Sequence, residues 1–503
     1  PTYPVASGKV REPKTLGAAA ENGDVATARE LVASGADLNA PDGSGWAPLH
    51  SALRYGHATI AEALLDRGAS LSATNPDGWT PLMFATRYGH PTLAKRMIEA
   101  GADPGAAAKD GWTALMLAAR NDQAENALLL LQKGADPNAR TKGGVSPLML
   151  AAGYAPAEVV EALLAKGADL SARDGDGWTA LHWALRYERR DAARRLVERG
   201  VDVQAADDEG WTPLMYALRY GAEDVALLLL DKGARVNERN KNGWSPLHFA
   251  LRNGATRAAR LLIESGADLG RTTSDGWTPL LTALRNDQGE NARLLIEKGV
   301  DLDAKNQDGW TPLMMALRYD QGECARLLAQ KCKKLDEKDK DGWTALMFAL
   351  RYGHPEAAAT LLQRGAAFQY TVEGGWEPLL TALRNGQAEN ARKLIQKGAN
   401  PKAKTSQGWS ALMLAIEYDQ LENAKLLFEK GADPTVQSSD GDTALSLAKK
   451  KGSFELIRLL GGAEPAGNAF AAATEGPAPV AGIVILPPGA KVVSREDCAP
   501  GLN

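Results

Sequence analysis

The sequence of 503 residues predicts an all-α solenoid, an elongated and curved stack of helix–turn–helix units. Two observations lead to this prediction. Tryptophans recur from Trp46 to Trp409 at intervals of 33 residues or a multiple of 33, and a fixed period of this length is the signature of a repeat architecture. Most periods also contain a turn, an apolar stretch, a Gly and a second apolar stretch, which predicts a pair of helices in each.

The repeat register divides the chain into three parts. Residues 1–8 carry no periodic pattern and are expected to form an N-terminal arm. With each Trp at the fifth position of its unit, fourteen units starting at residue 9 give a solenoid with terminal capping repeats over residues 9–470. Residues 471–503 are rich in Ala, Pro and Gly, which predicts an extended C-terminal tail. The apolar patch at 480–486 in this tail is consistent with packing on a surface and equally with a mobile linker.

Residues 75–107 show how one unit is expected to fold. Gly78 marks a turn, and Thr80 and Pro81 supply the cap and the first residue of a helix. A second helix follows before Gly101 stops the unit, and its apolar side chains at helical spacing are Leu93, Ala94, Met97 and Ile98. A helix pair of this kind cannot bury its apolar faces alone, so each unit requires its neighbours.

The terminal units depart from the pattern as capping repeats do. Residues 13–16 replace the Trp-Thr-Pro-Leu box in the first unit, and the last unit has Asp442 at the Trp position and lysines at 449–451. Its second helix, expected over residues 454–460, has no successor. Polar outer faces on terminal units keep a solenoid soluble.

The pattern Gly-x-Thr-Pro-Leu-x-x-Ala, then Gly-His, then Leu-Leu-x-x-Gly-Ala-Asp resembles the ankyrin repeat, and the resemblance covers residues 9–470. It implies an ankyrin-repeat solenoid in which β-turn fingers and inner helices form a concave face, with outer helices behind them. It also implies a protein-binding scaffold whose partner contacts come largely from the finger tips and the inner-helix surface.

Three residue types recur at positions that the resemblance places on the partner-facing side. Eleven of the twelve tryptophans follow the turn Gly, where the fold does not require a Trp, and Trp183 is the exception. An Arg lies eight residues after most of these tryptophans, and a Tyr often follows the Arg directly. The predicted partner-binding residues are Trp46, Trp79, Trp112, Trp178, Trp211, Trp244, Trp277, Trp310, Trp343, Trp376, Trp409, Arg54, Arg87, Arg120, Arg186, Arg219, Arg252, Arg285, Arg318, Arg351, Arg384, Tyr55, Tyr88, Tyr187, Tyr220, Tyr319 and Tyr352.

Two interpretations of these stripes stay open. In the first, each Trp packs against an Arg of its own or an adjacent unit, a contact that contributes about 0.5–1 kcal/mol when exposed. Finger carboxylates then neutralise the Arg side chains, and the candidates are Asp77, Asp110, Asp176, Asp275, Asp308 and Asp341. In the second, the stripes line a binding groove, because Trp, Tyr and Arg are enriched at interface hot spots. Both can hold together, since a pre-ordered ladder loses less entropy on binding.

We therefore expect a non-enzymatic protein-binding scaffold whose concave Trp/Arg/Tyr-lined groove holds a protein partner, extended or filamentous, or makes the chain a subunit of a larger assembly. One chemical element per roughly 10 Å suits an elongated ligand better than a compact one. A first alternative is a binder of polysaccharide or another polymer that stacks on the Trp ladder. A second is a structural spacer with a self-packed Trp–Arg ladder.

The ladder is interrupted once, at Val145 and Gly153, and it weakens at Glu417 and Asp442. The interrupted unit also has Pro156 at the entry to its second helix. Because Pro restricts the backbone there, we expect a local change of curvature in this unit.

The charge of the chain argues against a nucleic-acid partner. The formal net charge is -4 and the pI is about 6.0, whereas neutralising a phosphate backbone needs a net basic surface. No run of 18 or more apolar residues is present, so no transmembrane segment is predicted. A chain that begins at Pro1 without a Met is consistent with loss of an initiator Met or of a signal peptide. A cytoplasmic and a periplasmic or secreted location therefore both stay open.

Nothing in the sequence predicts catalysis, a cofactor or a metal site. All six histidines fall on repeat positions where hydrogen bonds to neighbouring turns are the expected role: His50, His57, His90, His182, His248 and His354. None of them lies in a Cys, Asp or Glu cluster at ligand spacing. The cysteines are sparse, and Cys324 and Cys332 are expected near opposite ends of one helix, too far apart for a disulfide; the third is Cys498.

Overall fold

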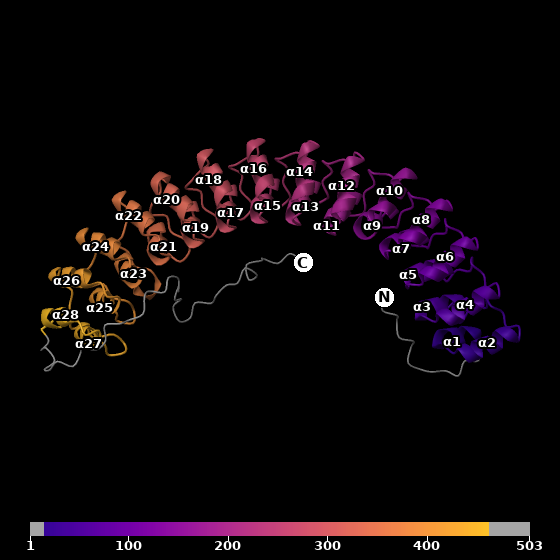
Figure 1. Cartoon of the computed structure of the whole chain (residues 1–503), viewed down its shortest axis with the longest axis horizontal. Coiled ribbons are helices and arrows are strands. Elements are labelled where there is room, and N and C mark those ends of the chain that lie inside the picture. Colours follow the sequence, from indigo (N-terminus) through magenta and orange to yellow (C-terminus); the bar gives the residue numbers. More distant parts are fainter. Residues whose placement is uncertain (1–14, 462–503) are drawn as a thin grey trace, which may run out of the picture.

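The computed structural model describes residues 15–461, which form 28 α-helices and one short 3₁₀ helix. Figure 1 shows the helices arranged as an arch, with the odd-numbered helices along its concave side and the even-numbered helices along its convex side. Every inner helix contacts the next inner helix, and most outer helices contact the next outer helix. Strand-like pairing in the described residues is limited to isolated bridges within the fingers.

The helices alternate between the two layers in chain order. The inner helices are α1 (Leu16–Asn22), α3 (Pro48–Tyr55), α5 (Pro81–Arg87), α7 (Ala114–Arg120), α9 (Pro147–Tyr154), α11 (Ala180–Arg186), α13 (Pro213–Arg219), α15 (Pro246–Arg252), α17 (Pro279–Arg285), α19 (Pro312–Arg318), α21 (Ala345–Arg351), α23 (Pro378–Arg384), α25 (Ala411–Glu417) and α27 (Ala444–Lys450). The outer helices are α2 (Val25–Ala33), α4 (Ala58–Asp66), α6 (Pro91–Glu99), α8 (Ala124–Gln132), α10 (Ala157–Ala165), α12 (Arg190–Glu198), α14 (Glu223–Asp231), α16 (Thr256–Glu264), α18 (Gly289–Glu297), α20 (Gly322–Lys331), α22 (Pro355–Gln363), α24 (Ala388–Gln396), α26 (Leu421–Glu429) and α28 (Phe454–Leu459). The 3₁₀ helix η1 (Glu373–Gly375) lies in one finger.

The helix signals act as the sequence predicts in the unit over residues 75–107. The Thr80 hydroxyl oxygen accepts a hydrogen bond from Met83 N at 3.3 Å, and Pro81 is the first residue of α5. Gly101 follows α6 with a φ of 92°, a left-handed conformation that favours glycine.

The fingers are short loops that bond to one another through their backbones. Lys109 N donates to Asp77 O of the preceding finger at 2.8 Å. Gly111, the turn residue of this finger, has a φ of 86°, and a Cβ there would lie 2.3 Å from Arg140 O of the following finger. Glycine is required here both by the backbone conformation and by the close approach of the next finger.

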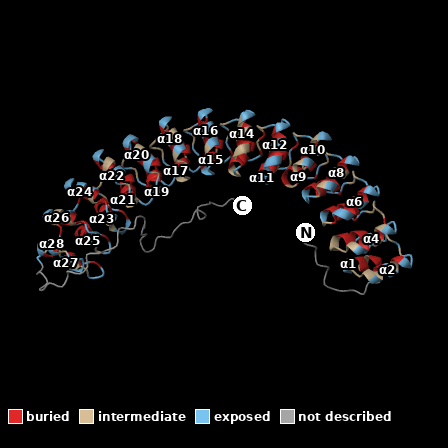
Figure 2. Ribbon diagram, viewed as in Figure 1, coloured by how far each residue is buried: buried red, intermediate tan, exposed pale blue. Residues whose placement is uncertain are grey.

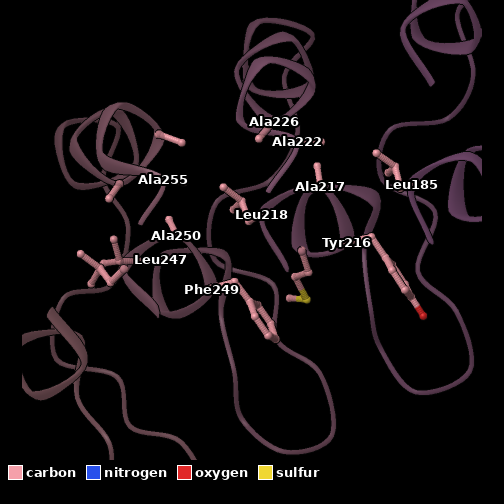
Figure 3. Packing of buried hydrophobic residues seen from close by; sticks show 14 of the residues in the cluster. Leu185, Tyr216, Ala217, Leu218, Ala222, Ala226, Leu247, Phe249, Ala250 and Ala255 are labelled. Carbon is pink, nitrogen blue, oxygen red and sulfur yellow. The ribbon is translucent and has the colours of Figure 1, made fainter. Parts of the chain in front are cut away.

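Small and medium-sized apolar side chains fill the space between the two helix layers. Figure 2 shows the buried residues on the sides where the helices face one another. In Figure 3, Ala217 and Ala250 of the inner layer face Ala222 and Ala255, whereas Phe249 points away toward the finger loops. Alanine at these contacts lets the inner and outer helices of a unit pack closely.

The described residues confirm the predicted all-α solenoid, elongated and curved. Thr15 caps α1, and α28 ends at Leu459, one residue before the expected end. The N-terminal arm, the C-terminal tail with its apolar patch, and Cys498 lie outside the described residues, so the domain boundaries stay predictions. Between residues 15 and 461, no helix has the length and apolarity to cross a membrane.

Candidate functional site

The inner helices lie along the concave side of the arch (Figure 1), and in the sequence each predicted Trp precedes one of these helices and each predicted Arg lies at the end of one. Each Trp lies in a finger two residues before an inner helix begins, and each Arg is the last or next-to-last residue of that helix. All eleven predicted Trp side chains are half-buried and pack against the core. The predicted Tyr side chains are also half-buried, except Tyr187 and Tyr319, which are 40% and 41% exposed.

A polar residue four positions before the Trp fixes the backbone of the finger. Asn306 Oδ1 accepts a hydrogen bond from Trp310 N at 3.0 Å, and Asp339 Oδ1 accepts one from Trp343 N at 2.8 Å. The same bond is made by Asp42, Asn75, Asp174, Asp207, Asn240, Thr273 and Thr405. These residues were not predicted as part of the site, although the recurrence of Asp, Asn or Thr at one repeat position is a signal in the sequence.

In eight units the Arg at the end of the inner helix lies over the Trp of its own unit. The guanidinium carbon is 4.7 Å from the ring centre in the Arg54–Trp46 pair and 5.6 Å in the Arg120–Trp112 pair. The other pairs, between these distances, are Arg87–Trp79, Arg219–Trp211, Arg252–Trp244, Arg285–Trp277, Arg351–Trp343 and Arg384–Trp376. Each contact holds a cation against a ring face and so orders both side chains.

Arg186 lies over a tyrosine of the next unit instead of over Trp178. Its guanidinium carbon is 5.2 Å from the centre of the Tyr220 ring, and that of Arg219 is 5.7 Å from the same ring. The same arrangement recurs at 4.8 and 5.7 Å with Arg318, Arg351 and Tyr352. Successive arginines therefore share one ring at two places along the groove.

Aromatic side chains of the inner helices fill the gaps between successive Trp rings. The Phe249 ring centre is 4.7 Å from that of Trp211 and 5.2 Å from that of Trp244. The same repeat position, five residues after the Trp, carries three other rings that each contact two tryptophans: Phe84, Tyr216 and Phe348. These residues were not predicted from the sequence as part of the site. The recurrence of an aromatic residue at this one repeat position was the feature of the sequence that could have indicated them.

The interruption of the ladder is filled from the following unit. Trp183, the tryptophan outside the register, lies five residues after Trp178, the repeat position that carries the inner-helix rings in other units. Its indole N–H donates to Asp174 Oδ2 at 2.8 Å. A Cβ at Gly153 would lie 3.0 Å from the Tyr187 ring and 3.3 Å from the Trp183 ring. A side chain at the Arg position of this unit would therefore displace both rings. The local change of curvature expected in this unit stays a prediction.

The predicted Arg side chains have no acidic partner among the described residues. None of the ten predicted Arg side chains forms an ion pair or a side-chain hydrogen bond within residues 15–461, and Arg54 Nε is buried without an acceptor. The expectation that finger carboxylates neutralise them is therefore wrong. Asp308 instead pairs with Lys340, because the backbone bond from Lys340 N to Asp308 O, 3.0 Å long, holds the two fingers side by side.

Arg252 is repelled by the arginines of the two neighbouring units. Partial burial, together with the positive charges of Arg219 and Arg285, lowers the pKa of Arg252 below its ordinary value. Within residues 15–461, the arginines at the ends of the inner helices thus lie against aromatic rings and not against anions.

The histidines act as links between neighbouring units, as predicted. His182 Nδ1 accepts a hydrogen bond from Thr179 N at 3.1 Å, and Nε2 lies 3.3 Å from Trp211 O of the next finger. Burial lowers the pKa of His50, His182 and His248 to about 4, so these rings are neutral at pH 7. His57, His90 and His354 bond a carbonyl of the preceding unit through Nε2.

The described residues contain no group of three His, Cys, Asp or Glu side chains placed to hold a metal ion. Cys324 and Cys332 are both buried and free, and burial raises the pKa of each thiol. Cys332 directly follows α20 with a φ of -57°, where most units have a left-handed Gly.

Comparison with known proteins gives two matching family models. One, described as ankyrin repeats (three copies), matches residues 68–141, 148–240, 234–306, 299–373 and 367–438. The other, described as ankyrin repeats (many copies), matches residues 31–85. No curated protein matches the sequence.

Proposed function

The chain belongs to the ankyrin repeat family, whose members generally mediate protein–protein interaction, and from this premise we propose that it is a scaffold that binds a protein in its concave groove. Proteins of this family are typically non-enzymatic, and we extend that property to this chain. The proposed contact residues are the predicted Trp, Arg and Tyr side chains. The inner-helix rings Phe84, Tyr216, Phe249 and Phe348 are buried and support the tryptophans from beneath.

The partial burial of the tryptophan side chains supports the proposal. Each is half-buried, so its ring is held in place yet keeps an accessible part. Trp, Tyr and Arg are the residue types that contribute most to binding at interfaces. Because the finger bonds and the Arg contacts already order these side chains, a partner would lose little further side-chain entropy on docking.

The regularity of the groove favours an extended partner, or assembly with a repetitive one. Units that repeat at the spacing of packed helices, roughly 8–10 Å, offer the same contact many times along one direction. A compact domain would meet only a few of these contacts, whereas an extended segment would meet one in each unit.

A triple substitution in the middle of the groove tests the proposal. We expect Trp244→Ala, Trp277→Ala and Trp310→Ala together to abolish co-purification of the partner from the native source, measured by quantitative mass spectrometry. The matched control carries Leu228→Ala, Leu261→Ala and Leu294→Ala, which remove the same number of apolar side chains from the outer helices. Unchanged recovery of the partner with the Trp variant would contradict the proposal.

The polymer-binding and spacer functions each explain fewer of the observed Trp and Arg contacts than the protein-binding function does. A sugar ring stacks on an open indole face, and in eight units a guanidinium already covers one face. A spacer explains a self-packed ladder but gives no reason for a row of cations that have no acidic partner within residues 15–461. A Trp fluorescence shift on adding oligosaccharides to the full chain would favour the polymer binder.

A further inference from the structure

The longest uninterrupted part of the Arg stripe runs from Arg186 to Arg384, with one Arg at the end of each inner helix from α11 to α23. In the part of the chain that the structure describes, no carboxylate pairs with any side chain of this run. A row of like charges weakens the fold unless something compensates it. The described residues contain no carboxylate that offsets the repulsion among these arginines.

Several cations elsewhere in the described residues do pair with acids of a neighbouring unit. On the convex side, Arg260 Nη2 lies 3.2 Å from Glu290, and Arg293 Nη1 lies 2.9 Å from Glu323. Each of these pairs links one outer helix to the next, and Arg194 and Asp224 form another. Ion pairs between neighbouring units are therefore available on the convex side, whereas the arginines of the run form none within residues 15–461.

The last unit shows that the groove itself can carry an ion pair. There Lys450 occupies the Arg position and Asp442 the Trp position, and the two side chains are joined at 2.6 Å. Where the finger supplies a Trp instead of an Asp, the Arg lies against an aromatic ring and has no acidic partner in the described part of the chain. The Trp–Arg combination thus provides an ordered cation that remains free to bind an anion.

The cationic run has defined ends. Gly153 precedes Arg186 at the equivalent position, and Glu417 follows Arg384. An anionic ligand that spans the run would meet a gap at one end and a repelling carboxylate at the other. The run therefore fits a ligand of limited length.

The spacing of the run matches one extended conformation of a polypeptide. Packed helices lie roughly 8–10 Å apart, and a polyproline II helix has three residues per turn at about 3.1 Å per residue, so every third side chain points the same way after about 9 Å. Grooves lined by aromatic rings are also the usual docking sites of this conformation. Resting on the protein-binding function proposed above, we infer that the run from Arg186 to Arg384 binds an extended acidic segment of a partner protein, in polyproline II conformation, with a carboxylate at every third residue.

A single-stranded nucleic acid fits the same cations less well. Acidic side chains stand exposed two residues after several of these arginines, at Glu188, Asp287 and Asp320. A phosphate backbone carries a charge on every nucleotide and would meet these carboxylates. An acidic peptide can place neutral residues opposite them.

Fluorescence anisotropy with the purified full chain tests the inference. The probe is a labelled peptide of eight Glu-Pro-Pro triplets. One control peptide has Gln in place of every Glu, and a second has the same composition with all its Glu residues in one block. We expect the triplet peptide to bind at least about tenfold more tightly than either control, because only it matches both charge and spacing.

A matched pair of variants locates the binding site. We expect Arg219→Gln, Arg252→Gln and Arg285→Gln together to weaken binding of the triplet peptide by at least about tenfold. The control, Arg194→Gln, Arg260→Gln and Arg293→Gln, removes the same charge from the convex side and should leave binding within about twofold. Circular dichroism melting of both variants verifies that each remains folded.

Equal binding of the Gln peptide, equal binding of the block peptide, or unchanged binding by the groove variant would each overturn the inference. Tighter binding of an oligothymidylate in the same titration would assign the run to nucleic acid instead. If the triplet peptide fails to bind while the Trp variant still loses its native partner, the inference is wrong and the proposed function stands. If the Trp variant keeps its partner, the proposed function itself is wrong.

Discussion

At the scale of single residues, the groove depends on how each finger holds its Trp. Asn306 Oδ1 accepts hydrogen bonds from Asp308 N and Trp310 N, both at 3.0 Å. This amide oxygen closes the turn that presents Trp310. The buried Asn306 side chain thus fixes the backbone position of the partly accessible Trp310.

Replacing Asn306 by Ala tests this role. Two backbone N–H groups lose their acceptor, so we expect the free energy of unfolding to fall by about 1–2 kcal/mol. Urea denaturation followed by Trp fluorescence measures the loss. Asn306→Asp is the control, because Asp339 makes the same bonds in the next unit. An Ala variant as stable as the Asp variant would contradict the stabilising role of the Asn306 side chain.

The turn glycines allow a second test, by comparing Gly111→Ala with Gly134→Ala. Both residues have a positive φ, 86° and 92°, but only at Gly111 would a Cβ meet backbone, at 2.3 Å from Arg140 O. We expect Gly134→Ala to cost about 1 kcal/mol from backbone strain alone, and Gly111→Ala to cost more. The two midpoints in urea give the comparison. Equal losses would mean that the contact between fingers is not close enough to matter.

The Trp register could be predicted at this scale, but the surroundings of the Arg side chains could not. The sequence places an Asp and an Arg in most units, which led to the wrong expectation that they pair. Whether they meet depends on where each finger lies relative to the next, and backbone bonds between fingers set Asp308 against Lys340 instead. The relative position of neighbouring fingers is part of the tertiary structure, and no short stretch of the sequence indicates it.

At the scale of elements, histidines join an inner helix to the following finger. Nδ1 of His248 accepts from Ser245 N at 3.4 Å, and Nε2 lies 3.1 Å from Trp277 O. A proton on Nδ1 would face the N–H of Ser245 and break this bond. The bond from Ser245 N therefore needs an unprotonated Nδ1, whereas Nε2 of the charged ring still donates to Trp277 O, and burial is what disfavours the charged ring.

The histidine pKa values predict how stability depends on pH. His50, His182 and His248 have a pKa of about 4 in the folded chain, against 6.5 for the free side chain. Below pH 6.5 the unfolded chain binds protons that the folded chain does not, so stability is greatest above pH 6.5 and falls as the pH drops toward 4. Each buried ring can contribute on the order of 3 kcal/mol to this loss.

A variant with Met at all three positions isolates the effect, because Met83 and Met215 occupy the same position in other units. We expect the melting temperature of the Met variant to fall less than that of the natural chain between pH 7 and pH 5. Parallel decreases in the two proteins would mean that other groups cause the acid sensitivity.

The helices themselves were predictable nearly to the residue. Thr80, Pro81 and Gly101 act as the start and stop signals that the sequence contains. Trp183 was harder to place, because it breaks the period of the other tryptophans. It follows a second period instead, that of the inner-helix rings, which becomes recognisable once Phe249 is seen between two indoles.

At the scale of the whole molecule, each unit depends on its neighbours and not on distant parts of the arch. The contacts run from one inner helix to the next and from most outer helices to the next. Stability in such an array is close to a sum of unit and nearest-neighbour terms. The effect of a core substitution should therefore remain local.

Leu247→Ala tests this locality. Leu247 is fully buried in α15, and we expect its truncation to cost about 2–5 kcal/mol locally. Hydrogen exchange read by mass spectrometry should speed up in α13 to α18 and stay unchanged in α3 to α6. Faster exchange along the whole arch would show that the solenoid unfolds as a single unit.

The central claim is that partners bind the concave groove. Hydrogen exchange of the full chain, measured alone and with the protein that co-purifies with it, tests this most directly. We expect slower exchange in the fingers and inner helices between Trp178 and Arg384, with exchange in the outer helices α12 to α24 unchanged. Slower exchange in the outer helices with unchanged fingers would place the partner on the convex side and contradict the claim.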